Sequence, residues 1–262
     1  MDINSLAILG GVAFTAGFLD AIAGGGGLIT LPALMVAGVH PVNAIATNKV
    51  QAAAATVSAT VAFARKGMID WQAGRGVVLV SAVGGIVGAT LVSLVNKTWL
   101  QALVPVLLVL IAAYFALAPS MSEGSRQRQR ISMGAFTFAI APLLGAYDGF
   151  FGPGVGSFFM VGFVALCGLQ IMQAISMTKL ANAACNLGSL SIFAMSGLII
   201  WPIALTMAAA AFAGAQLGAR AAVRVGPRLV KPMVITACLA LAWKLLTDEH
   251  NPLRQGIGSF FG

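Results

Sequence analysis

The sequence predicts an all-α integral membrane protein built from two inverted-topology repeats of transmembrane helices, each opening with a helical hairpin broken at glycines. The composition, four long stretches without charge and an internal repeat lead to this prediction. Only 8% of the 262 residues are charged and 59% are hydrophobic, and the mean hydropathy is +0.95. A water-soluble protein of this size needs a far more polar surface, so we expect a multi-pass membrane protein in contact with lipid.

The stretches without Asp, Glu, Lys or Arg distinguish helices from a β-barrel. They cover residues 76–96, 98–122, 149–178 and 180–219. A helix needs roughly 20 apolar residues to cross the hydrocarbon, whereas a barrel strand of about 10 residues alternates polar and apolar side chains. The stretches do not alternate, so they predict helices.

The chain repeats itself, which predicts two related halves. Gly17, Asp20, Gly24 and Gly26 align with Gly145, Asp148, Gly152 and Gly154. After a two-residue insertion, Lys49, Gly67, Trp71 and Gly88 align with Lys179, Gly197, Trp201 and Gly218. We therefore expect a first repeat over residues 1–120, a basic cytoplasmic linker over 121–130, a second repeat over 131–250 and a tail over 251–262.

Each half begins with a long apolar segment, residues 6–38 or 131–166, that is too long for one helix. Glycines 24–27 interrupt the first segment, and Gly152, Pro153, Gly154 and Gly156 interrupt the second; glycine and proline at this density should break a helix. Further spans are expected at 43–64, 76–95 and 99–118, and in the second half at 170–196, 200–219 and 229–246.

The basic residues predict the topology, because Lys and Arg accumulate on the cytoplasmic side. If each opening segment crosses the membrane once, the thirteen Lys and Arg residues outside the spans divide eight against five. If it forms a hairpin or crosses twice, they divide ten against three, with only Lys97, Lys244 and Arg254 on the minority side. We therefore expect antiparallel halves with both termini in the periplasm. Whether the opening segment crosses twice or is re-entrant stays open.

Four ionisable residues fall inside the apolar segments: Asp20, Lys49, Asp148 and Lys179. Each costs a few kcal/mol at the centre of a membrane helix, so each requires a functional or structural reason. Lys49 and Lys179 beside the glycine breaks would create a positive site for an anion. Alternatively, Asp20 pairs with Lys49 and Asp148 with Lys179, so that each half is held together by its own ion pair.

Polar residues around the two lysines extend this candidate substrate site. Lys179, Asn182 and Asn186 share one helix face. The alternative role for the Ser, Thr and Asn side chains near the lysines, Ser176 included, is hydrogen bonding between helices. The candidate substrate-binding residues are Lys49, Lys179, Asn48, Thr47, Gln51, Thr178, Asn182, Asn186 and the glycines of the breaks, Gly25, Gly26 and Gly154.

Other features of the sequence suggest structural roles. Gly84, Gly85 and Gly88, matched by Gly214 and Gly218, are expected to permit close helix packing. Trp71 and Trp201 are expected at the lipid interface. The net charge of +8 comes from loops rather than from one face, so no nucleic acid is expected as a partner. We found no nucleophile with a base and no cluster of metal ligands, and expect neither an enzyme, a metal nor a cofactor.

The first half also resembles the TauE/SafE sulfite exporter family. The residues that carry the resemblance are Gly17, Asp20, Ala21, glycines 24–27, Leu31 and Pro32, then Ala46, Thr47, Asn48, Lys49, Val50 and Gln51, and finally Gly67, Ile69 and Asp70. The second half carries a weaker copy in Tyr147, Asp148, Gly149, Gly152, Gly154, Gly156, Thr178, Lys179 and Asn182. It replaces the run of four glycines with Gly-Pro-Gly, so its half of the site is expected to differ in shape.

The resemblance implies a secondary transporter that exports sulfite or small organosulfonates, such as sulfoacetate, across the bacterial inner membrane. Two alternatives remain open at this point. One is a proton or cation pathway that uses Asp20 and Asp148 as ligands, and the other is a non-transporting membrane scaffold.

Overall fold

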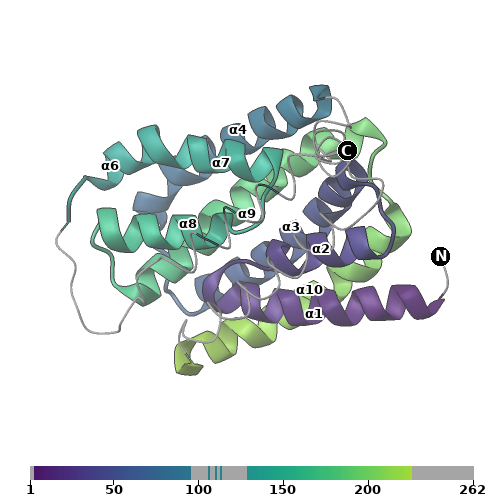
Figure 1. Ribbon diagram of the computed structural model, residues 1–262. Coiled ribbons are helices and arrows are strands. Elements are labelled where there is room, and N and C mark those ends of the chain that lie inside the picture. The colour runs from purple at the N-terminus through teal and green to yellow at the C-terminus, as the bar shows by residue number, and fades with distance from the viewer. Residues whose placement is uncertain (1–2, 96–105, 107–109, 111–112, 114–128, 226–262) are drawn as a thin grey trace.

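The computed structural model describes residues 3–95, 106, 110, 113 and 129–225, and its two described stretches, 3–95 and 129–225, fold into helices without a strand (Figure 1). The first half contains α1 (Ile3–Ala23), α2 (Gly27–Val36), α3 (Pro41–Arg65) and α4 (Trp71–Leu94). In the second half, α6 (Met133–Ala135), the π-helical η1 (Phe136–Ile140) and α7 (Ala141–Phe150) follow without a gap, as do α8 (Val155–Val161) and η2 (Gly162–Leu166). Then come α9 (Ile171–Ser196) and α10 (Trp201–Val225). The expected spans 99–118 and 229–246, most of the linker and the tail 251–262 lie outside the described residues.

Within residues 3–95 and 129–225, three helices are long and apolar enough to cross a membrane: Ile3–Ile22, Trp71–Leu94 and Trp201–Ala222. Two shorter apolar helical segments, Gly27–Val36 and Val155–Leu166, follow the breaks. At about 1.5 Å per residue, α2 is roughly 15 Å long, about half of the hydrocarbon thickness. Each opening segment therefore combines a long helical arm with a short one.

Local sequence explains where the helices start. Asp70 accepts hydrogen bonds from the backbone nitrogens of Gln72 and Ala73, both at 3.0 Å, and so caps α4. This cap starts α4 at Trp71, five residues before the expected start at 76. Pro41 occupies the first turn of α3, where its missing N–H is harmless. Trp71 and Trp201 begin α4 and α10 and are about half exposed, as an interfacial position requires.

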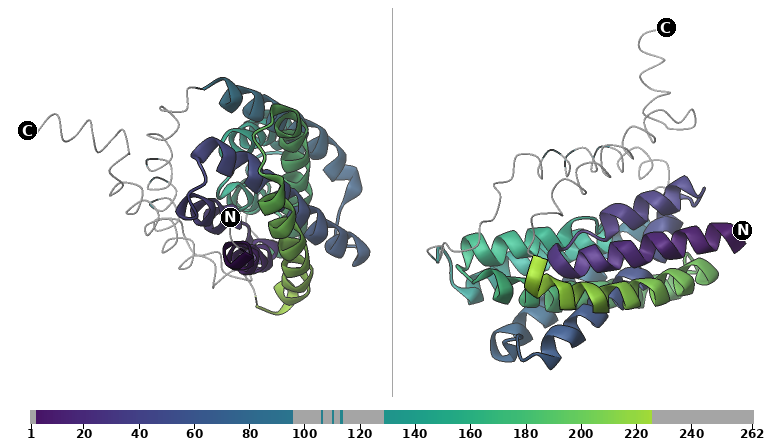
Figure 2. Two further views of the ribbon diagram at one scale, coloured as in Figure 1. Left: turned by 90° about the vertical axis from the view of Figure 1, so that its right-hand side faces the viewer. Right: turned by 90° about the horizontal axis from the view of Figure 1, so that it is seen from below.

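The helices of one half pack against those of the other. Helix α1 lies along α10, and α4 lies against α7 and α9 (Figures 1 and 2). Helix α3 packs against both α9 and α10. In the repeat, α1 corresponds to α7 and α4 corresponds to α10. The contact between α1 and α10 therefore corresponds to the contact between α7 and α4. In Figure 1, α1 starts at the right and α6 at the left, so α1 and α7 run in opposite directions along the bundle.

Glycines allow these helices to approach closely, as predicted. A Cβ atom on Gly85 would overlap the carbonyl oxygen of Cys185 in α9, and one on Gly88 would overlap that of Ala146 in α7. In the other half, a Cβ on Gly218 would overlap the carbonyl oxygen of Phe18 in α1. The backbones are thus in direct contact, as small residues permit in membrane bundles.

The two breaks in the opening segments meet inside the bundle. Gly24 and Gly152 have φ values of 79° and 98°, in the left-handed region that glycine adopts without strain. A Cβ on Gly24 would lie only 2.7 Å from the carbonyl carbon of Gly156. Ser157 Oγ also donates a hydrogen bond of 3.2 Å to the carbonyl oxygen of Gly24. The breaks therefore form one contact between the halves.

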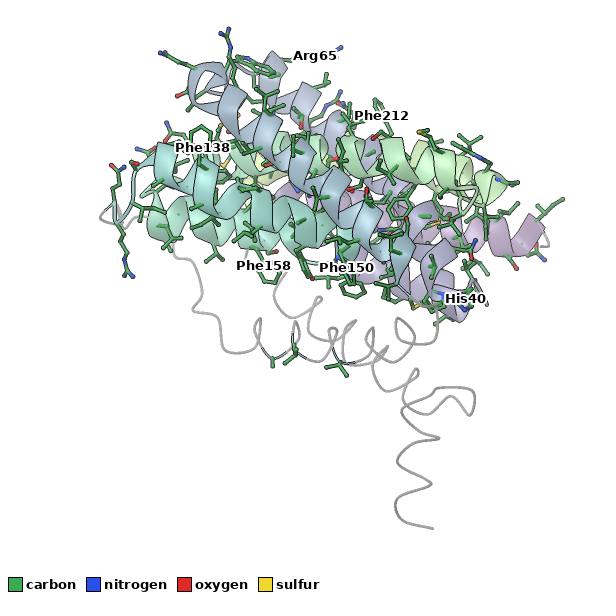
Figure 3. All side chains as sticks on the ribbon, turned by 90° about the horizontal axis from the view of Figure 1, so that it is seen from above. His40, Arg65, Phe138, Phe150, Phe158 and Phe212 are labelled. Atoms are coloured by element: carbon green, nitrogen blue, oxygen red, sulfur yellow. The ribbon has the colours of Figure 1, made fainter. Side chains whose placement is uncertain are left out.

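The described basic residues outside the helix centres gather at one end of the bundle. Lys66 Nζ donates to the carbonyl oxygen of Ala219 at 3.4 Å, which joins the end of α3 to the end of α10. Ser176 Oγ donates to Met68 O at 2.8 Å, and Arg130 N to Leu166 O at 2.8 Å. These bonds bring the segment before α6 and the connection between η2 and α9 to the same end. The residues concerned are Arg65, Lys66, Arg75, Arg130 and Arg220. In Figure 3, Arg65 lies far from His40, which precedes α3 at the opposite end.

Candidate functional site

The four buried charged residues form two ion pairs that join the halves. Lys49 of α3 pairs with Asp148 of α7, with 3.0 Å between Nζ and Oδ1. Lys179 of α9 pairs with Asp20 of α1, with 3.0 Å between Nζ and Oδ2. Each ammonium group also donates to the main-chain carbonyl oxygen of the same aspartate.

The alternative of ion pairs within each half, Asp20 with Lys49 and Asp148 with Lys179, is therefore wrong. Each aspartate lies one helical turn before the break in its own half. Because the breaks pack against each other, each turn faces the central helix of the opposite half. Gly152 shows this placement directly, since a Cβ on it would lie 2.9 Å from Lys49 Nζ.

The carboxylate of Asp20 is held by several donors. The backbone nitrogens of Gly25 and Gly26 donate to its Oδ1 at 2.9 and 3.0 Å, and Lys179 occupies its Oδ2. The Gly25 and Gly26 amides, expected to bind substrate, thus bind this side chain in the structure. Both oxygens of the Asp20 carboxylate therefore have hydrogen-bond donors.

Asp148 differs from its repeat partner. Lys49 occupies Oδ1, but within the described part of the chain Oδ2 is buried and accepts no hydrogen bond of normal geometry. The thiol of Cys185, a weak donor, also lies beside this carboxyl group. The Gly-Pro-Gly break thus provides no equivalent of the two glycine amides that hold Asp20.

A small cavity lies between the breaks and the central helices α3 and α9. Its volume is about 20 Å³ for the centre of a water molecule, enough for at least one water. Among the predicted site residues, the cavity is lined by Lys49, Asn48, Gln51, Asn182, Asn186, Gly25, Gly26, Gly154, Asp20 and Asp148. Lys179, Thr47 and Thr178 do not belong to this lining.

Amide side chains form much of the polar surface of the cavity. Asn186 Nδ2 donates to Asn182 Oδ1 at 2.8 Å, and Asn186 Oδ1 accepts from Lys49 Nζ at 3.5 Å. Asn48 Oδ1 accepts from Thr30 Oγ1 at 2.6 Å. Gln51 is 1% exposed, and its Oε1 finds no hydrogen-bond partner among the described residues. A bound solute or water is therefore needed to satisfy part of this lining.

The hydroxyl groups of Thr47, Ser176 and Thr178 are close to the lysines in sequence but do not line the cavity. Thr47 Oγ1 accepts a hydrogen bond of 3.1 Å from the backbone nitrogen of Ile200, just before α10. Ser176 Oγ donates to Met68 O on the opposite end of the bundle. Each bond joins a helix of one half to a loop of the other half. Thr178 Oγ1 is buried with no hydrogen-bond partner in residues 3–95 and 129–225.

Seven lining residues were not among the candidate site residues: Gly27, Ala52, Ala55, Thr56, Gly152, Val155 and Gly156. Thr56 lines the cavity two turns after Lys49; it aligns with Asn186, and this match in the repeat could have identified it. Gly152 lies against the Lys49–Asp148 pair. Within the described ranges, no three His, Cys, Asp or Glu side chains gather as ligands for a metal.

Comparison with known proteins gives one consistent result over nearly the whole chain. The family model described as "Sulfite exporter TauE/SafE" matches residues 9–245. "Probable membrane transporter protein ORF9" of Sinorhizobium sp is 42% identical over 97% of this chain and 97% of its own. "Probable membrane transporter protein YfcA" of Escherichia coli K12 is 40% identical over 94% of this chain and 91% of its own. A "Probable membrane transporter protein" of Haemophilus influenzae is 36% identical over 95% of this chain and 97% of its own. No solved structure matches the chain.

Proposed function

The chain belongs to the TauE/SafE sulfite exporter family of membrane transporters, and from this premise we propose that it exports small sulfur-containing anions across the bacterial inner membrane. The proposed substrates are sulfite and organosulfonates such as sulfoacetate. The observation that carries the proposal is the buried ammonium group of Lys49, which lines the central cavity beside amide side chains.

The chemistry of the cavity suits a compact oxyanion. Lys49 supplies a positive charge, and charge-assisted hydrogen bonds to an oxyanion are about twice as strong as neutral ones. The side-chain amides of Asn48, Gln51 and Asn182 border the same space and can donate to sulfur-bound oxygens. A cation would instead need several free carboxylate oxygens. Asp20 already binds Lys179 and two backbone amides, and Asp148 offers one such oxygen, Oδ2, in the described residues.

We also propose that the halves form inverted repeats with the substrate bound between them. Three observations support this arrangement: the exchanged pattern of helix contacts, the opposite directions of α1 and α7 in Figure 1, and the meeting of both breaks at the cavity. In such transporters, broken helices meet near the midplane of the membrane. The shortness of α2 favours a re-entrant hairpin over two full crossings.

Calorimetric titration of purified protein with sulfite, sulfoacetate, taurine and sulfate tests the proposed function. We expect sulfite or sulfoacetate to bind, and Lys49→Ala to weaken this binding roughly ten- to a hundredfold, because one charge-assisted donor is lost. Arg65→Ala is the matched control, since it removes the same charge from the exposed end of the same helix.

Three outcomes would contradict the proposal. If none of the four solutes binds folded protein, the scaffold alternative becomes the better account. If Lys49→Ala binds the sulfur anions as tightly as the parent while remaining folded, the anion is not bound by this ammonium group. If neutralising the aspartates abolishes solute binding while Lys49→Ala retains it, a cation or proton pathway is favoured.

A further inference from the structure

The charges around the cavity balance before any solute binds, and this has a consequence for the proposed transport of anions. Asp20, Asp148, Lys49 and Lys179 form two neutral ion pairs, with all four side chains buried. A bound anion adds one uncompensated negative charge in a medium of low dielectric constant, where isolated charges are strongly disfavoured. Uptake of one proton restores the balance.

The structure distinguishes the two carboxyl groups that could accept this proton. Protonation of Asp20 would weaken hydrogen bonds from Gly25 N, Gly26 N and Lys179 Nζ together. Asp148 has one oxygen on Lys49 and one that is buried without a normal hydrogen bond in the described residues. Both aspartates line the cavity, so an anion there can compete with Asp148 for Lys49.

The surroundings of Asp148 contain few other charged or titratable groups. Lys49 faces it from α3, Cys185 from α9 and, at longer range, Asp20 from α1. Lys49 must keep its proton to attract the anion. The Cys185 thiol donates a hydrogen bond of 3.0 Å to the carbonyl oxygen of Ala181. Because it already carries a proton, it is not the group that accepts one. Asp148 is thus the acceptor that the geometry selects.

We propose that Asp148 takes up one proton each time a monovalent anion binds to Lys49, so that anion and proton cross the membrane together. In this step, a proton from water forms an O–H bond with the Asp148 carboxylate. The ammonium group of Lys49 exchanges its ion pair with Asp148 for one with the anion. No bond in the anion breaks, and release on the other side reverses both changes. Asp20 stays ionised and keeps the first break in place.

This inference rests on the proposed function and adds the coupling ion, its stoichiometry and the group that carries it. It also assigns different roles to the two halves, since their aligned aspartates have different partners. Net movement is then driven by the sum of the anion and proton gradients, and an anion that accumulates in the cytoplasm leaves with a proton.

Proteoliposomes with a pH-sensitive dye inside and a clamped membrane potential test the proposal. Methanesulfonate and ethanesulfonate are the probes, because both are monovalent anions whose sulfonate groups do not titrate near neutral pH. The parent should move about one proton with each anion, and its methanesulfonate flux should not respond to the potential. Asp148→Asn should lose proton movement at least about tenfold relative to anion movement, and its methanesulfonate flux should become sensitive to the potential. Asp20→Asn and Cys185→Ala should keep the ratio of the parent.

The outcomes separate this inference from the function on which it rests. If the parent moves neither probe, the proposed function fails and the inference fails with it. If the parent moves anions without protons, or if Asp20→Asn rather than Asp148→Asn uncouples them, the function stands and the inference is overturned. Should Asp148→Asn not fold, titration of the parent in buffers of different ionisation enthalpy decides. About one proton taken up per bound anion supports the proposal, and none overturns it.

Discussion

Lys49 and Asp148 neutralise each other's charge in the buried interior of the bundle. Their side chains are 1% and 2% exposed. A buried ion pair adds little stability compared with apolar residues of similar size, but removal of one partner leaves an isolated charge in the interior. Replacing either residue alone therefore destabilises the protein more than replacing both. A double-mutant cycle can use this effect to show which residues are partners.

We predict that Lys49 couples to Asp148 and not to Asp20. Lys49→Met or Asp148→Asn alone should lower the free energy of unfolding by about 3–5 kcal/mol. The double variant should be more stable than the sum of the single effects predicts, by at least about 1 kcal/mol. Lys49→Met with Asp20→Asn should be additive within about 0.5 kcal/mol. Denaturant unfolding in detergent measures all of these variants. A larger coupling of Lys49 to Asp20 than to Asp148 would restore the pairing within each half.

Much of the candidate site could be predicted at the residue level, because charged residues are rare inside apolar segments. Asp20, Lys49, Asp148 and Lys179 were identified in this way, and Asn48, Gln51, Asn182 and Asn186 do line the cavity. The partners could not be predicted, because a repeat gives the spacing within each half but not how the halves face each other. The hydrogen bonds from the Gly25 and Gly26 amides to Asp20 lie within the first half. They were not foreseen because they depend on the backbone geometry of the break, which the run of glycines does not give.

At the level of elements, the breaks were predictable because glycine is the main residue that adopts positive φ without strain. Helix α1 ends at Ala23 and α2 begins at Gly27, as the run of glycines indicates. The apolar stretch begins at residue 76, and α4 extends it back to Trp71 because the carboxylate of Asp70 caps the helix, which hydropathy alone does not detect. The length of α2 was also beyond prediction, since its apolar sequence continues past Val36 and the helix ends before Gly38, at φ 85°.

The glycines between α4 and α7 provide an element-scale prediction. Gly88→Ala should lower the free energy of unfolding by about 1–3 kcal/mol, because the new methyl group overlaps the backbone of Ala146 and separates the helices. Gly11→Ala in α1 is the control: a Cβ there meets nothing within 4 Å, and alanine favours a helix by roughly 1 kcal/mol over glycine. Thermal unfolding of both variants in the same detergent makes the comparison. Equal stability of the two variants would show that backbone contact between α4 and α7 is not required.

At the scale of the whole molecule, the loops at the two ends of the bundle differ in charge. The end that contains Arg65, Lys66, Arg75 and Arg130 joins the loops of both halves through Lys66–Ala219, Ser176–Met68 and Arg130–Leu166 hydrogen bonds. At the opposite end, Asn43 Nδ2 donates to Leu198 O at 2.8 Å. Lys97, Lys244 and Arg254, the expected minority, lie outside the described residues. All described basic residues outside the two ion pairs are therefore in the majority group that the sequence predicted.

This asymmetry predicts that the basic end faces the cytoplasm, because loops rich in Lys and Arg are retained on that side. In a variant with Cys167, Cys185 and Cys238 replaced by alanine, Ser196→Cys at the end of α9 should react with a membrane-impermeant maleimide on intact cells. Gln72→Cys, near the start of α4 at the basic end, should react only after the membrane is permeabilised. Both positions are exposed in the structure, so a lack of reaction from outside reflects the membrane rather than burial. Reversed labelling would invert the orientation, and labelling of both sites on intact cells would contradict the placement of the two ends on opposite sides of the membrane.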